Sequence, residues 1–373
     1  MKRLVVKIGS NILTSGENGL NLERMQSIAD DISSVRDAGY EVAVVSSGAV
    51  AAGMKKLDLK EKPRDIVLKQ ASAAVGQSTL MWAYEKCFNT HDRKVAQILL
   101  TRDDFADRKR YINSRNTLIT LLSYEVVPII NENDTVATDE IRFGDNDHLA
   151  SLVAGLIDAE RLIILSDVDG LFSDDPGKNP GATLIEVVER ITSEIEEKAG
   201  GSGSAVGTGG MYSKLLAAKR AVHHGITVNI INGRKKGVIS SLLSGARLGT
   251  EFSPQKTRLS SKKGWIAYAC RTKGSVVIDN GAVKALTQGG KSLLPSGIVS
   301  VSGSFEAGDA VYCIDSRGNR IAKGLANYSS SEVEKIKGKK TSEIESILGY
   351  RYSDEVVHRD NLVLVEGLKK ADH

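Results

Sequence analysis

Short apolar runs alternate with longer helical patterns through the first 250 residues, and this alternation is the strongest constraint on the fold. The apolar runs are nearly continuous, as expected for strands covered on both faces of a sheet. We predict strands at residues 4–8, 42–46, 95–100, 126–130, 162–166 and 228–231. Helical patterns lie between them at 22–38, 65–87, 114–124, 147–158 and 211–224. This alternation favours a mostly parallel sheet in an α/β/α sandwich.

The composition changes near residue 254. Residues 1–253 carry 31 basic and 33 acidic side chains, whereas the remaining residues carry 19 and 13, a net charge of +6. The polar segment 254–263 suits a linker. Beyond it we predict a small, mainly β module at 264–350 and a C-terminal tail at 351–373. The predicted elements of the module are strands at 274–279, 297–302, 309–314 and 320–325 and helices at 330–337 and 342–348.

Several classes of protein are disfavoured by composition. The three cysteines are scattered and form no C-x-x-C pair, so we expect a reducing cytoplasm rather than a disulfide framework. The apolar run at the start is too short for a signal peptide. No stretch approaches about 18 consecutive apolar residues, so we expect no membrane span. The net charge of +4 is too small to indicate nucleic acid by itself.

Polar side chains gather where the predicted strands end, which is where open α/β sheets bind ligands. Lys7 is embedded in an apolar strand, so its ammonium either reaches an edge or meets an anion. The segment 46–48 reads Ser-Ser-Gly, which suits either an anion-binding turn or a simple helix cap. The segment 131–134 reads Asn-Glu-Asn-Asp and suits gripping an amine or a carboxylate. The acids of 145–147 precede a helix, where they are either caps or functional groups.

Two further segments extend this pattern. Ser166 and Asp167 end another strand, and the glycine-rich run 207–210 precedes a predicted helix. Glycines at a helix start let backbone amides approach an oxyanion. Lys214 would lie one turn into that helix, exposed, with its side chain reaching back to the same place. A flexible loop is the alternative for the glycine run, and a lid that closes on a nucleotide satisfies both interpretations.

Together these residues supply what phosphoryl transfer needs. Cations stabilise the moving phosphoryl group, backbone amides hold the other phosphates, and Mg²⁺ bridges phosphate oxygens. Mg²⁺ keeps several waters and needs few protein carboxylates, so we expect it to be carried by the phosphates of ATP and assign it no protein ligand.

Six motifs occur in the order found in glutamate 5-kinases of the amino acid kinase family, which the chain therefore resembles. They are VVKIGSN, SSGAVAAG, INENDTVAT, FGDND, LSDVDGLF and GTGGMYSK. The segment 264–350 resembles a PUA domain, and residues 1–253 would be the kinase domain. The resemblance implies ATP-dependent phosphorylation of the γ-carboxylate of L-glutamate, the first step of proline biosynthesis.

The resemblance also assigns residues. Its catalytic positions fall on Lys7, Lys214 and Asp147, with Asp147 holding the two lysines. Its glutamate-binding positions fall on Ser47, Asp134 and Asn146, with Asp145 supporting the pocket. Its ATP-binding positions fall on Lys7, Ser166, Asp167, Thr208, Gly209, Gly210, Met211, Tyr212, Ser213 and Lys214. Ser166 and Ser213 stand where the family often has threonine, and both keep a hydroxyl.

Partners also follow from the resemblance. It implies inhibition by proline, a homo-oligomer that is a dimer or a tetramer, and contact with the next pathway enzyme, glutamate-5-semialdehyde dehydrogenase. Two alternatives stay open: a sister kinase for acetylglutamate, aspartate, carbamate or uridylate, and an RNA-binding protein acting through the PUA-like module. The few aromatics of the C-terminal part argue against a working RNA site.

Overall fold

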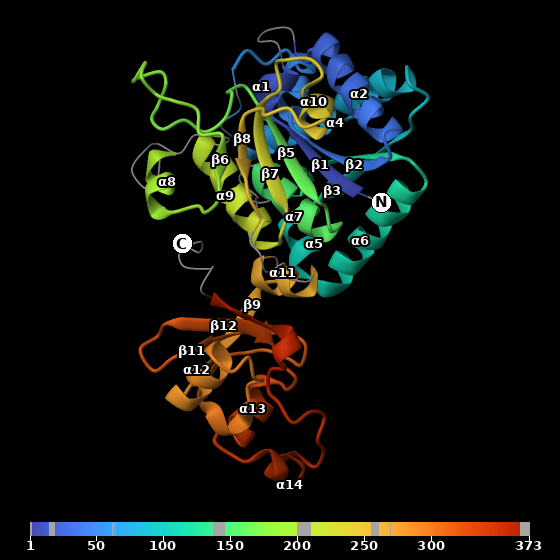
Figure 1. Cartoon of the computed structure of the whole chain (residues 1–373). Helices are drawn as coiled ribbons and strands as arrows, with labels where there is room; N and C mark the ends of the chain where they lie inside the picture. Colours follow the sequence, from blue (N-terminus) through green and yellow to red (C-terminus); the bar gives the residue numbers. More distant parts are fainter. Residues whose placement is uncertain are drawn as a thin grey trace. The chain divides into compact units, whose positions relative to one another are not determined.

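The computed structural model divides into two compact units, Met1–Arg258 and Leu259–His373 (Figure 1). It describes residues 2–14, 19–61, 63, 65–136, 146–199, 210–254, 261–268 and 270–365. No helix within these ranges is both long and apolar enough to cross a membrane. Each unit has its own sheet.

The first unit is built on an eight-stranded sheet with the strand order β3-β4-β2-β1-β5-β7-β8-β6. All pairings are parallel except that of β7 with β8. The six strands predicted from the sequence are confirmed: β1 (Lys2–Ile8), β2 (Tyr40–Ser46), β3 (Val95–Leu100), β4 (Val127–Glu132), β5 (Arg161–Ser166) and β7 (Thr227–Asn232). Two short strands were not expected, β8 (Thr250–Phe252) and the edge strand β6 (Val187–Val188).

Helices cover both faces of this sheet. On one face, α2 (Leu22–Asp37), α4 (Ile66–Asn89) and α10 (Val238–Leu243) pack on Leu4, Val6 and Ile8 of β1. Because side chains alternate along a strand, Lys7 of β1 lies on the opposite face. There α7 (Asn146–Leu156) packs on β1 and β5, and α9 (Met211–His223) packs on α7 and β7. The remaining helices are α1 (Ser10–Leu13), α3 (Ala49–Lys56), α5 (Arg102–Ala106), α6 (Arg108–Ser123) and α8 (Ser193–Lys198).

Helices α3 and α4 approach each other through two glycines. A Cβ at Gly53 would lie 1.7 Å from the carbonyl oxygen of Ser72, and a Cβ at Gly76 would lie 1.7 Å from that of Ala49. Neither position therefore accepts a side chain without moving a backbone. Helix α3 follows directly on the turn at Gly48, whose φ of 103° also favours glycine. The glycines of the motif SSGAVAAG thus set the close packing of the turn and its helix.

The second unit has a five-stranded sheet with the order β10-β9-β11-β12-β13. Its four predicted strands are confirmed, and its largest fully buried side chains are Phe305 and Tyr328. Residues 351–365, assigned to a tail from the sequence, instead contribute a strand and the fully buried Val356 and Val357. A helix also begins at Ser261, within the predicted linker. The elements are α11 (Ser261–Tyr268), β9 (Thr272–Ile278), α12 (Asn280–Thr287), β10 (Ile298–Gly303), β11 (Ala310–Ile314), β12 (Arg320–Leu325), α13 (Ser330–Ile336), α14 (Ile344–Leu348) and β13 (Leu362–Leu364).

Candidate active site

A cleft of about 470 Å³ opens at the carboxyl ends of β1, β2, β4 and β5. Its walls include most of the polar residues selected from the sequence. Those that line it are Lys7, Ser47, Asp134, Asn146, Ser166, Asp167 and Lys214. The location agrees with the rule that open α/β sheets bind ligands at their carboxyl edge.

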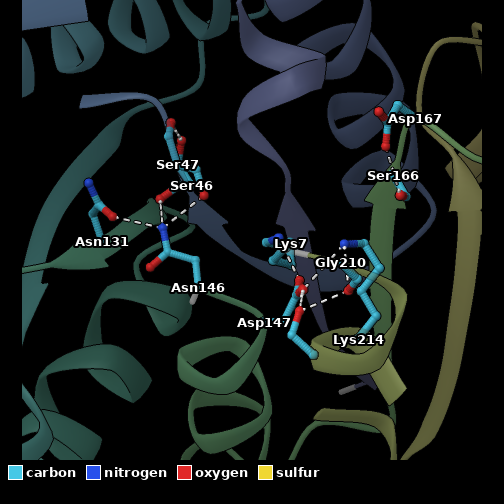
Figure 2. Close-up of polar contacts among 11 residues, drawn as sticks. Lys7, Ser46, Ser47, Asn131, Asn146, Asp147, Ser166, Asp167, Gly210 and Lys214 are labelled. Carbon is cyan, nitrogen blue, oxygen red and sulfur yellow. Dashed lines mark hydrogen bonds and ion pairs between the residues drawn. The ribbon is translucent and has the colours of Figure 1, made fainter. Parts of the chain in front are cut away.

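Asp147 holds two lysines on the floor of this cleft (Figure 2). Its Oδ1 lies 2.5 Å from Lys7 Nζ, and its Oδ2 lies 3.5 Å from Lys214 Nζ. The Asp147 side chain is fully buried, and those of Lys7 and Lys214 are only 3% and 8% exposed. One carboxylate compensates two ammonium groups, so the cluster carries a net positive charge and favours an added anion.

The local sequence explains how these three residues meet. Asp147 lies in the first turn of α7, where the helix dipole favours an acid. Lys214 is the fourth residue of α9, and its Nζ also lies 3.5 Å from the carbonyl oxygen of Gly210. The hydroxyl of Ser213 lies 3.0 Å from both Asp147 Oδ2 and the Gly210 carbonyl oxygen. The expectation that Lys214 is exposed was wrong, because its ammonium turns inward to the carboxylate.

Asn146 ties together the ends of β2 and β4. Its Nδ2 lies 2.7 Å from the carbonyl oxygen of Ser46, 2.9 Å from Ser47 Oγ and 3.0 Å from Asn131 Oδ1 (Figure 2), and these three acceptors share its two hydrogens. Asp134 lies two residues beyond the end of β4 and is half-buried. It lines the cleft together with Asn146, and we refer to this side of the cleft as the wall of Asn146 and Asp134. This wall offers hydroxyl, amide and carboxylate groups, which suit the ammonium and carboxylate of an amino acid.

Ser166 and Asp167 form the other wall, at the end of β5. Burial disfavours ionisation of Asp167, but hydrogen bonds from Asn11, from its own backbone amide and from Ser166, together with the charge of Arg234, outweigh it and lower the pKa of the carboxyl. Asn11 donates to Asp167 Oδ2 at 3.0 Å and itself lines the cleft. Sequence reasoning missed Asn11, although it ends the quoted motif VVKIGSN.

The structure does not place every residue that was predicted from the sequence. Asp145, Thr208 and Gly209 lie outside the described residues. Gly210 caps α9, which begins with Met211 and Tyr212. Within the described part of 207–214, only Lys214 lines the cleft.

The described residues contain no group of three or more His, Cys, Asp or Glu side chains that could hold an ion. Both oxygens of Asp147 already face ammonium groups.

Each of the two units matches a known protein family. Residues 2–232 match the model of the amino acid kinase family, and residues 274–348 match that of the PUA domain. The glutamate 5-kinase of Syntrophotalea carbinolica is 52% identical over 98% of this chain and 97% of its own, and that of Geobacter sulfurreducens is 52% identical over 98% of each. The solved UMP kinase of Bacillus anthracis aligns with 68% of this chain and 96% of its own, with a TM-score of 0.48 and 16% identity. That last likeness is too distant to bear on the reaction.

Proposed function

The chain belongs to the amino acid kinase family, and on that premise we propose that it phosphorylates the γ-carboxylate of L-glutamate with ATP. The products are L-glutamyl 5-phosphate and ADP, and the reaction is the first step of proline biosynthesis. Relatives about half identical over nearly the whole chain carry the name glutamate 5-kinase, which supports this substrate over those of the sister kinases.

The observation that carries the proposal is the cluster of Lys7, Asp147 and Lys214. It sits between the wall of Asn146 and Asp134 and the wall of Ser166 and Asp167. A phosphoryl group in transit between two substrates carries charge on its equatorial oxygens. Two ammonium groups held in place by one buried carboxylate would stabilise that charge without reorganising during the reaction.

The acceptor needs no general base. The γ-carboxylate of glutamate has an ordinary pKa of about 4.3, so it is an ionised nucleophile near neutral pH. Its oxygen attacks the γ-phosphorus, the bond from that phosphorus to the bridging oxygen breaks, and ADP leaves. The wall around Asn146 would hold the amino acid so that this oxygen is in line.

The residues present fit a nucleotide. Gly9 and Lys7 both line the cleft, so a phosphate that enters it would meet the Lys7 ammonium. We assign the triphosphate to Lys7, Lys214 and the wall of Ser166 and Asp167. Mg²⁺ bound to phosphate oxygens would neutralise part of their charge.

Trapping of the acyl phosphate tests the proposal. The protein is incubated with ATP, Mg²⁺ and hydroxylamine, and L-glutamate, N-acetylglutamate, L-aspartate and UMP are offered separately. We expect hydroxamate from L-glutamate alone and no UDP from UMP. Product from another acceptor and none from L-glutamate would assign the chain to a sister kinase. No product from any of these acceptors would overturn the proposed reaction.

The location, regulation, assembly and protein partner of the chain are further proposals. We expect action in the cytoplasm, inhibition by proline, a dimer or tetramer, and contact with glutamate-5-semialdehyde dehydrogenase. They rest on the resemblance of the sequence alone.

A further inference from the structure

Two residues of helix α4 contact Asn131 and Ser46, which both accept hydrogen bonds from Asn146. Gln77 Oε1 accepts a hydrogen bond from Asn131 Nδ2 at 3.0 Å, and the Tyr84 hydroxyl lies 2.8 Å from Ser46 Oγ. Gln77 and Tyr84 are seven residues apart, which places them on one face of the helix. Asn131 and Ser46 are the two strand-end residues whose oxygens receive the Asn146 amide.

The neighbours of the Asn131 side chain determine which of its atoms accepts and which donates. The backbone amide of Glu132 donates to Asn131 Oδ1 at 2.9 Å, and a backbone N–H can only donate. The Oδ1 atom is therefore an acceptor, which also receives Asn146 Nδ2. The Nδ2 of Asn131 must then donate elsewhere, and Gln77 Oε1 takes that hydrogen bond.

This assignment of donors and acceptors determines which atom of the Asn146 amide can contact a substrate. Its Nδ2 is directed to the strand ends, so the oxygen Oδ1 is the group left for a ligand. No described residue donates a hydrogen bond to this oxygen, and Asn146 lines the cleft. A free carbonyl oxygen accepts hydrogen bonds from an ammonium group and not from a carboxylate.

Burial of the Gln77 amide is energetically unfavourable. The residue is 8% exposed, and its Nε2 has no hydrogen-bond partner among the described residues. An unsatisfied buried amide is destabilising, so packing alone favours an apolar side chain of similar length. Such a side chain would leave Asn131 Nδ2 buried without an acceptor. The accepting oxygen of Gln77 explains its presence.

We propose that Gln77 is a positioning residue for the acceptor amino acid: it orients Asn131, which turns the Asn146 amide so that Oδ1 faces the substrate ammonium. The inference rests on the proposed function, because it assumes an amino acid in this part of the cleft. Gln77 acts through Asn131 and Asn146 and touches no reacting atom.

The test is a double-mutant cycle on the full chain, with KM for L-glutamate, KM for ATP and kcat measured for each variant. Gln77→Met keeps the side-chain length and removes the acceptor. We expect its glutamate KM to rise roughly tenfold, as for loss of about one hydrogen bond, while the ATP KM changes less than about twofold. In an Asn146→Ala background the same substitution is expected to change glutamate KM less than about twofold, because coupled residues are not additive.

Two further variants guard the interpretation. Gln77→Glu keeps an accepting oxygen and is expected to stay closer to the parent glutamate KM than Gln77→Met. Ser72→Ala is the matched control, since its buried hydroxyl donates within α4, to the Leu68 carbonyl oxygen; its glutamate KM should not change. If Gln77→Met does not fold, Gln77→Glu alone decides, and a tenfold rise in its glutamate KM contradicts the proposal.

Other outcomes separate this inference from the proposed function. An unchanged glutamate KM in Gln77→Met, or effects of Gln77→Met and Asn146→Ala that multiply in the double variant, would overturn the role of Gln77 and leave the kinase assignment intact. A parent protein that forms no glutamyl hydroxamate would instead remove the proposed function and this inference with it.

Discussion

Asp147 Oδ1 lies 2.5 Å from Lys7 Nζ, and both side chains are almost fully buried. The same carboxylate also faces Lys214, so Asp147 contacts two buried cations at once. Burying a charge without a partner is strongly unfavourable. The geometry therefore links the stability of the fold to the charge that the proposed reaction needs.

Asp147→Asn should lower both stability and turnover. The substitution leaves two buried ammonium groups without their carboxylate, which costs about 3–5 kcal/mol when a buried pair is broken. Because a bound polyphosphate would replace the lost charge, ATP should raise the melting temperature of the variant more than that of the parent. Calorimetric scans with and without ATP check this. An equal shift in both proteins would contradict the assigned charge balance.

Lys214→Met should abolish most of the turnover while the fold is kept. Methionine preserves the buried stem of the side chain and removes the ammonium, so transition-state stabilisation is lost and kcat should fall about 10²–10³-fold. Lys219→Met is the matched control on the same helix, since Lys219 pairs with Glu196 instead. A Lys214→Met variant as active as the Lys219→Met control would remove Lys214 from the mechanism.

Asp134→Asn should weaken binding of glutamate and spare ATP. Asp134 lines the wall that carries Asn146, and a neutral amide attracts an ammonium less than a carboxylate does. We expect glutamate KM to rise about tenfold or more, with ATP KM nearly unchanged. Steady-state kinetics with each substrate varied in turn give the answer, and a selective rise in ATP KM would place Asp134 on the wrong side of the cleft.

Asp167 should contribute to stability only above acidic pH. Its pKa is lowered in the folded protein despite partial burial, so its contribution is present above the unfolded pKa of about 3.9. That contribution is lost as the pH falls through the folded value. The difference in melting temperature between the parent and Asp167→Asn should therefore be larger at pH 7 than at pH 3. A difference that grows on acidification would reverse the sign of the assigned shift.

Gly53→Ala should destabilise the first unit and disturb the acceptor site. The added Cβ would meet the Ser72 backbone, so α3 and α4 must separate, at a cost of about 1–3 kcal/mol. Because α3 starts at the turn after Ser47, glutamate KM should rise as well. Gly177→Ala is the control, since its Cβ would approach only the Asp175 side chain. Equal melting temperatures of the two variants would contradict the packing argument.

The sequence was informative wherever a local pattern decides the structure. Near-continuous apolar runs predicted the six main strands, and polar residues directly after them predicted the cleft. Lys7 stood out because the ammonium of a lysine inside an apolar strand must either reach an edge or meet an anion. Contacts between elements far apart in the sequence could not be predicted in this way. The inward orientation of the Lys214 side chain depends on the packing of α9 against α7. Gln77 lies in a helix without a polar motif, 54 residues from its partner Asn131.

The most direct test of the central claim follows the oxygen atom of the nucleophile. L-glutamate labelled with ¹⁸O in its γ-carboxylate is incubated with the enzyme, ATP, Mg²⁺ and hydroxylamine, and the released phosphate is examined by mass spectrometry. If the carboxylate attacks phosphorus, hydroxylamine then attacks the acyl carbon, and the phosphate leaves with one ¹⁸O atom. We expect one ¹⁸O in the phosphate for each hydroxamate formed. Phosphate without ¹⁸O would show that water or another acceptor takes the phosphoryl group, which contradicts the proposed reaction.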